Sequence, residues 1–131
     1  MSLWHRDKAY LSRLIIPLLL YKRDGEVTKP NVGTTYDVLA SEFENLSLPR
    51  GRVRIHAGGA VSDWPQDYYI GIRDYYSDTL IIDYKFHQAS KSGFNITTTW
   101  GNVLDNNQVW YQLVVRASTS AEMTFRYILL E

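Results

Sequence analysis

Histidines and carboxylates are the residues of this sequence whose types could support catalysis or metal binding. His5, His56 and His87 form no H-x-H or H-E-x-x-H spacing, the kind of pattern that brings two imidazoles to one metal. His56 and His87 are expected on the outer faces of strands, where they would meet, joined by Asp83, only if those strands are neighbours. Two separate exposed histidines are the simpler interpretation, so we predict no metal site.

Aspartate is frequent in the chain, but four of the six aspartates considered lie in or beside predicted turns. Paired carboxylates at a fixed separation hydrolyse glycosidic bonds, whereas aspartate is also a common turn residue. The segment Asp105-Asn106-Asn107 offers oxygen ligands for calcium but lacks the spacing and glycine of a calcium loop. There is no G-x-S-x-G, P-loop or zincin motif. We therefore predict that the protein is not an enzyme and uses no cofactor. The aspartates considered are Asp63, Asp67, Asp74, Asp78, Asp83 and Asp105.

Length, composition and charge exclude further classes of function. The 131 residues suit one domain, and the absence of Cys excludes disulfides and thiolate chemistry. The formal net charge of +0 argues against a nucleic-acid partner, which favours a basic excess, and it leaves self-association unopposed. The longest apolar run, residues 14–21, is shorter than the roughly 18 residues of a membrane span. Because charged residues follow this run instead of a cleavage site, we predict no targeting segment.

Alternating apolar residues indicate an all-β chain. The central stretch predicts a β-hairpin near the middle of an antiparallel sheet, with strands at residues 68–76 and 80–87 around Ser77-Asp78-Thr79. Many short strands separated by turn residues are typical of an antiparallel β-sandwich, of which the jelly roll is one form. The six clearest strands are residues 52–57, 68–76, 80–87, 94–100, 109–117 and 121–130.

The alternation also predicts which side chains are buried. Residues 52–57 place Val53, Ile55 and Ala57 inward, and Gly58-Gly59 should then loosen the chain. In the last strand, Met123, Phe125, Tyr127 and Leu129 are expected inside, while Ile128 and Leu130 are expected outside and covered or paired.

The domain division that we predict is an N-terminal arm with a short hairpin in residues 1–33 and the β-sandwich in residues 34–131. Residues 6–15 fit a helix ended by Pro17, or else an extended arm. Asp24-Gly25 between extended runs predicts the hairpin. Residues 37–45 fit a helix and residues 42–48 a strand; the strand is slightly favoured.

Exposed aromatic rings are the remaining functional signal. Tyr and Trp combine apolar area with a polar group and are enriched at interfaces, although packing within strands explains any single ring equally well. Trp64 precedes Pro65, which holds it extended and favours a presented indole. The candidate partner-binding residues are Trp4, Leu14, Ile15, Leu18, Trp64, Tyr69, Tyr75 and Trp110.

These features predict a non-enzymatic structural subunit that associates with itself or with another structural protein. The lack of Cys, the ten Tyr, the neutral charge and the apolar arm give a composition that resembles small structural proteins of viruses, notably thermophile viruses. This resemblance implies a capsid or virion role, with the virion or an extracellular surface as its location. The alternative is a carbohydrate-binding module that stacks sugars on Trp64, Trp100 or Trp110.

Overall fold

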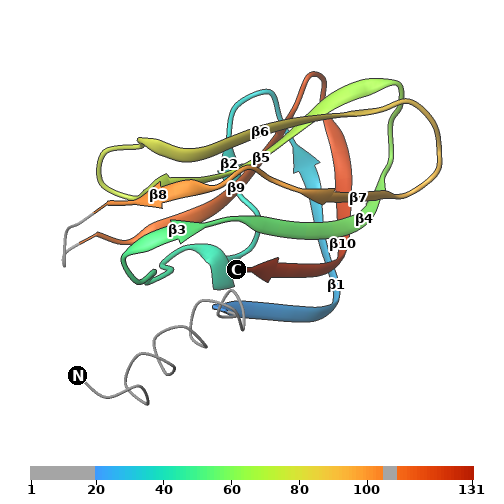
Figure 1. Cartoon of the computed structure of the whole chain (residues 1–131). Helices are drawn as coiled ribbons and strands as arrows, with labels where there is room; N and C mark the ends of the chain where they lie inside the picture. The colour runs from blue at the N-terminus through green and yellow to red at the C-terminus, as the bar shows by residue number, and fades with distance from the viewer. Residues whose placement is uncertain (1–19, 105–108) are drawn as a thin grey trace, which may run out of the picture.

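The computed structural model describes residues 20–104 and 109–131. These residues form ten β-strands and one short 3₁₀ helix, η1 (Figure 1). The elements are β1 (Tyr21–Val32), β2 (Asp37–Val38), η1 (Ser41–Phe43), β3 (Gly51–Val53), β4 (Ile55–Val61), β5 (Gln66–Asp74), β6 (Leu80–Gln88), β7 (Phe94–Thr97), β8 (Gly101–Val103), β9 (Tyr111–Ala117) and β10 (Ala121–Leu130).

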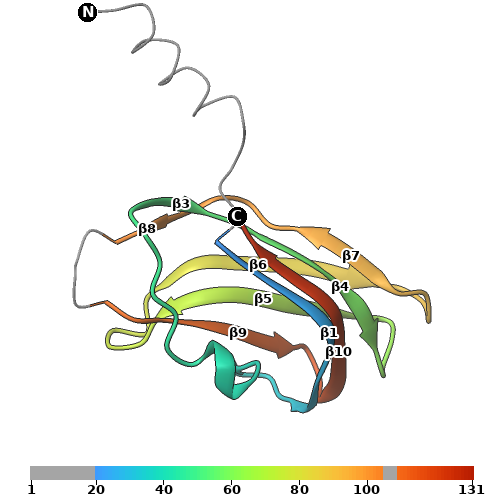
Figure 2. The ribbon, with the colours of Figure 1, turned by 90° about the horizontal axis from the view of Figure 1, so that it is seen from below.

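The strands form an antiparallel β-sandwich, as predicted. One four-stranded sheet has the order β1-β10-β4-β7 and the other has the order β2-β9-β5-β6, while β3 and β8 form a two-stranded extension. The pairs β1·β10, β2·β9, β3·β8, β4·β7 and β5·β6 are antiparallel and nest inside one another along the chain. The chain is therefore paired as one long hairpin that folds into two layers (Figures 1 and 2).

The core lies between the two sheets. A chain of aromatic contacts links Tyr68 to Phe86 at 5.9 Å, Phe86 to Phe94 at 5.0 Å and Phe94 to Phe125 at 5.4 Å between ring centroids. Because Phe86 belongs to one sheet and Phe94 to the other, this contact joins the layers. The predicted inward residues Val53, Ile55 and Ala57 are fully buried, which confirms the alternation in that segment.

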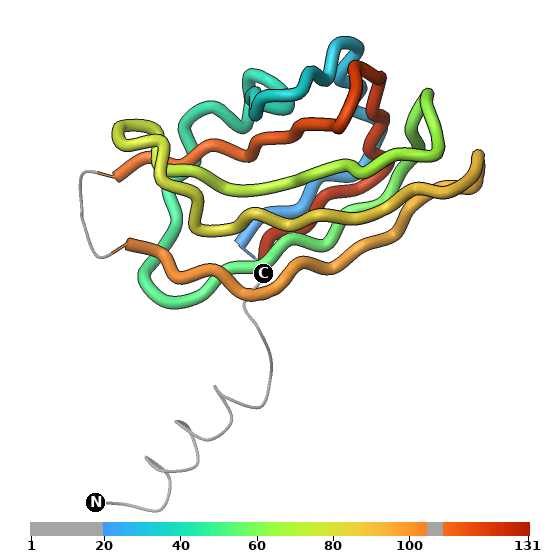
Figure 3. Tube along the Cα trace, turned by 90° about the horizontal axis from the view of Figure 1, so that it is seen from above, coloured from blue at the N-terminus to red at the C-terminus, as the bar shows by residue number. Residues whose placement is uncertain are grey.

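The predicted central hairpin is confirmed as β5 and β6, which pair from Gln66 with Gln88 to Ile72 with Ile82. β5 is an inner strand because β9 pairs on its other side, whereas β6 is an edge strand. β6 and β7 run along the same side of the sandwich (Figure 3).

The hairpin predicted at Asp24-Gly25 is wrong. The two residues lie inside the continuous strand β1, where the pairing with β10 shifts between Asp24 and Val27. A β-bulge there uses the positive φ of 96° at Gly25, which glycine adopts without strain. The turn signal was real, but it bends a strand instead of reversing it.

The burial predicted for the end of β10 is wrong because of a second bulge. The pairing with β4 shifts between Phe125 and Tyr127, so inside and outside exchange at that point. Ile128 and Leu130 are fully buried instead of outside, and Tyr127 and Leu129 are only half-buried. Both β1 and β10 change direction in mid-strand (Figure 1), as bulges at sandwich corners allow.

Gly58 and Gly59 do not loosen the chain but lie within β4. A Cβ on Gly59 would stand 1.8 Å from the Thr124 carbonyl oxygen, and one on Gly58 would stand 2.3 Å from the Tyr127 ring. The two glycines therefore permit close approach of β10 at its bulge.

The strand predicted for residues 42–48 and the alternative helix at residues 37–45 are both wrong. Instead β2 pairs with β9, η1 buries Phe43, and Leu46 forms an isolated bridge with Tyr111. The main chain of Leu46 exchanges two hydrogen bonds with Tyr111, at 2.7 and 2.8 Å, so this segment is fixed by β9 and not by its own periodicity.

The predicted boundary at residue 33, between an arm with a short hairpin and the sandwich, does not coincide with the start of the sandwich. Residues 21–32 lie within the sandwich because β1 pairs with β10. Residues 1–19 lie outside the described part of the chain, so the helical or extended arm stays a prediction. Over residues 20–104 and 109–131, no helix has the length and apolar character needed to cross a membrane.

Candidate functional site

Four exposed apolar side chains gather at one end of the sandwich, beside the β5–β6 turn and the ends of β8 and β9. We call this set the aromatic end: Tyr75, Tyr76, Leu104 and Trp110. Their exposed fractions are 47%, 66%, 40% and 43%, and they account for four of the five large apolar residues exposed in the described chain. A cluster of this kind is a normal mark of an interaction surface.

Asp74 holds the turn that presents the two tyrosines. Its carboxylate is buried and accepts hydrogen bonds from the Tyr76 amide at 3.0 Å and from the Ser77 hydroxyl at 2.8 Å. Its own amide donates to the Thr79 carbonyl at 2.8 Å, and its carbonyl accepts from the Asp78 amide at 2.9 Å. Both the side chain and the main chain of Asp74 therefore bond within the turn, and these bonds fix the backbone of Tyr75 and Tyr76.

Trp110 is joined to the same end by the main chain. The Tyr75 amide donates to the Trp110 carbonyl at 2.8 Å, and the Tyr75 and Tyr76 rings meet edge to face at 5.0 Å. The Leu104 amide donates to the hydroxyl of Tyr111 at 2.7 Å. Burial of Tyr111 raises the pKa of its hydroxyl, although the hydrogen bond from Leu104 acts in the opposite direction. The predicted residues Tyr75 and Trp110 are brought together here.

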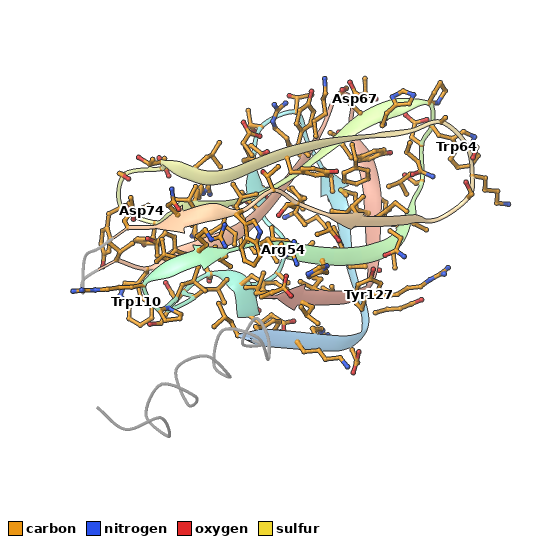
Figure 4. The ribbon with its side chains drawn as sticks, viewed as in Figure 1. Arg54, Trp64, Asp67, Asp74, Trp110 and Tyr127 are labelled. Atoms are coloured by element: carbon orange, nitrogen blue, oxygen red, sulfur yellow. The ribbon has the colours of Figure 1, made fainter. Side chains whose placement is uncertain are left out.

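Trp64 does not belong to this surface. It lies at the opposite end of the sandwich from Trp110 (Figure 4), in the loop between β4 and β5, next to a cis peptide bond to Pro65. Its exposed fraction of 38% fits the predicted presentation of the indole. The two tryptophans therefore cannot contribute to one contact on a single copy.

Tyr69 is also separate, and its ring face is covered. The Arg116 guanidinium lies 3.5 Å from the Tyr69 ring centroid and 5.2 Å from that of Tyr36. Tyr36, the residue before β2, donates a hydrogen bond to Asp83 on β6, at the far edge of the same sheet. Burial, followed by the hydrogen bond to Asp83, raises the pKa of Tyr36 far above its ordinary value. Periodicity alone misses this group because it depends on the strand order.

A similar arrangement covers Trp100, which lies between β7 and β8. The guanidinium groups of Arg52 and Arg54 lie 4.7 and 4.3 Å from its ring centroid. Arg54 also pairs with Glu131, and that hydrogen bond is the main reason that the pKa of Glu131 is lowered. Trp100 is therefore half-buried under two cations instead of standing free.

His56 and His87 lie in different sheets and do not meet. His56 on β4 contacts Glu131 and Thr97, both at 2.9 Å, while His87 on β6 contacts Asp67 at 2.8 Å. Within the described residues, no three His, Cys, Asp or Glu side chains group as metal ligands. The calcium candidate at residues 105–107 lies outside the described residues.

The four N-terminal candidates also lie outside the described residues: Trp4, Leu14, Ile15 and Leu18. Their role in partner binding stays a prediction.

Comparisons with known proteins assign no family. No protein-family model matches the chain, and no curated protein is similar to it. The geometry of the aromatic end is therefore the basis for a functional proposal.

Proposed function

We propose that the protein is a non-enzymatic structural subunit that self-associates through its aromatic end. The observation that carries this proposal is the exposure of Tyr75, Tyr76, Leu104 and Trp110 on a turn fixed by the buried Asp74 carboxylate. Rigid Tyr and Trp side chains bury large areas on binding at a small entropic cost. A fixed turn reduces this cost further because its backbone is already ordered before contact.

We further infer that the sandwich is a jelly roll. The nested antiparallel pairs and the two four-stranded sheets support this inference, since a jelly roll has eight main strands in two sheets. Jelly rolls occur in viral capsid and lectin domains, which are the two classes considered from the sequence. Because one fold serves many functions, this analogy supports a particle subunit only together with the aromatic end.

Sedimentation velocity over a range of protein concentrations tests the proposal. The wild-type chain should associate as concentration rises. The double variant Trp110→Ala with Tyr76→Ser should associate about tenfold more weakly, or more weakly still. Trp64→Ala is the matched control, because it removes an exposed indole at the opposite end of the molecule and should change nothing. Circular dichroism should show that all three proteins keep the same strand content.

Two results would contradict the proposal. One is a wild-type protein that stays monomeric at every concentration; the other is association whose strength is unchanged by the loss of Trp110 and Tyr76. A glycan array provides the test of the carbohydrate-binding alternative. Sugar binding that disappears with Trp110→Ala, in a protein that never self-associates, would replace the structural role with that alternative.

A further inference from the structure

The free edge of β6 carries a second feature, independent of the aromatic end. The Ser118 amide bonds to the Asp67 carbonyl and the Tyr75 amide to the Trp110 carbonyl, so odd-numbered residues of β5 direct their main chain toward β9. Main-chain groups alternate along an antiparallel strand, so even-numbered residues of β5 bond to β6. In the observed register, the even-numbered residues of β5 lie opposite even-numbered residues of β6, which therefore direct their main-chain groups toward β5. Asp83, Lys85 and His87 therefore point their N–H and C=O groups outward.

Within the described residues, these outward groups have no protein partner. β6 pairs only with β5, and no further main-chain hydrogen bond is made by Asp83, Lys85 or His87 within the described chain. At the start of the strand the edge is obstructed, because Gly101 packs so closely on the Ile81 carbonyl that a Cβ there would lie 2.3 Å from the oxygen. The open part of the edge therefore begins after Ile81.

The other edges differ from that of β6 in ways that prevent strand addition. β1 carries a bulge and Pro30, while β2 and β7 are only 2 and 4 residues long. Bulges, prolines and short strands are the usual protection of sheet edges against pairing. The 9-residue strand β6 has no proline, and its pairing with β5 is regular from Ile82 to Gln88. It is the long unprotected edge of the described sandwich.

We propose that β6 pairs antiparallel with β6 of a second copy, about a two-fold axis at Tyr84. This register places Asp83 opposite Lys85 of the other copy, twice by symmetry, and Tyr84 opposite Tyr84. The outward main-chain groups of Asp83 and Lys85 then face each other as hydrogen-bonded pairs. Opposite charges and aromatic pairs directly across two strands both stabilise a sheet. The β2-β9-β5-β6 sheets of the two copies then join into one continuous eight-stranded sheet.

Charge selects this register over its neighbours. An axis at Asp83 opposes two carboxylates, an axis at Lys85 opposes two ammonium groups, and an axis at Phe86 opposes Lys85 to His87. Only the axis at Tyr84 pairs opposite charges without a like-charge contact. The two side chains are ready for this contact: Lys85 is exposed without an ion-pair partner in the described chain, and Tyr36 already holds one carboxylate oxygen of Asp83.

This interface goes beyond the proposed function and uses residues outside the aromatic end. Its test is a charge reversal, measured as the dimer dissociation constant by sedimentation equilibrium. Lys85→Asp should weaken the dimer by about tenfold or more, since two attractive pairs become repulsive. Lys91→Asp is the matched control, because it makes the same change of charge on an exposed loop lysine and should leave the constant unchanged.

Complementation separates a specific register from a general charge effect. Asp83→Lys should also dissociate the dimer, but an equimolar mixture with Lys85→Asp should form a heterodimer in which every pair is opposite in charge. Thermal unfolding of each variant checks that it is folded before mixing. The inference is overturned if Lys85→Asp dimerises as well as the wild type, if Lys91→Asp is equally harmful, or if the folded variants do not combine. Association that depends on Trp110 and Tyr76 but not on Lys85 overturns this inference and leaves the proposed function standing.

Discussion

Replacement of Asp74 tests whether the buried carboxylate fixes the presenting turn. Asp74→Ala removes two hydrogen bonds to an ionised acceptor, from the Tyr76 amide and the Ser77 hydroxyl. Each such bond contributes about 1.5–3 kcal/mol. The variant also removes a buried charge and so regains part of its desolvation cost, while the freed amide in the turn can bind water. The expected net loss in the free energy of unfolding is therefore about 2 kcal/mol.

Urea unfolding followed by circular dichroism measures this loss, with an unchanged slope as the sign that two-state unfolding is preserved. Asp74→Asn keeps one acceptor for the Tyr76 amide, so its loss should be about half as large. Asp24→Ala is the control, because the Asp24 side chain is 75% exposed and its one ion pair within the described residues is a surface contact worth less than about 1 kcal/mol. The reasoning is refuted if Asp74→Ala lies within about 0.5 kcal/mol of the wild type. It is equally refuted if the variant loses stability but its self-association is unaffected.

Two further predictions concern the frame around the site. Gly59→Ala should destabilise the fold by about 3 kcal/mol or more, since its Cβ would stand 1.8 Å from the Thr124 carbonyl oxygen; Gly33→Ala, which meets no atom within 4 Å, should change urea unfolding little. For Glu131, a lowered pKa means that the folded state favours the charged form, so this residue stabilises the fold above its ordinary pKa of 4.5 and loses that effect as the pH falls. Unfolding measured from pH 6 to pH 3 should therefore show the wild type converging on Glu131→Gln; a constant gap between them would contradict this.

Period-two alternation predicted the fold class because the side chains of a half-buried strand must alternate. In β5, for example, Tyr68, Ile70, Ile72 and Asp74 alternate onto one face, and all four are buried. It failed beyond Phe125, where a bulge inserts an extra residue and inverts the faces, and the Asp-Gly turn signal failed at residues 24–25, where another bulge lies inside β1. Turn residues in a sequence do not distinguish a reversal from a bulge, since both use the same backbone conformations.

The site was less predictable than the core because it depends on strand order. Tyr75 and Trp110 were each candidates, but only the pairing of β5 with β9 brings them together. Tyr69 looked equally available from its alternation, yet Arg116 stands opposite it on β9 and covers its ring. No local pattern indicates which strand lies beside which, so no local pattern indicates which rings are covered.

The covered rings explain why an aromatic-rich chain offers so few places for contact. Arg116 stacks on Tyr69 in the sheet of β5 and β9, and Arg52 and Arg54 lie over Trp100 between β7 and β8. A guanidinium over an aromatic ring is attracted by the negative face of the ring and presents a polar surface to the solvent. These stacks make the covered surfaces less adhesive than the composition predicts. The association that we propose is therefore placed where no guanidinium covers the surface, at the aromatic end and at the open edge of β6, and the decisive variants lie at Trp110 and Lys85.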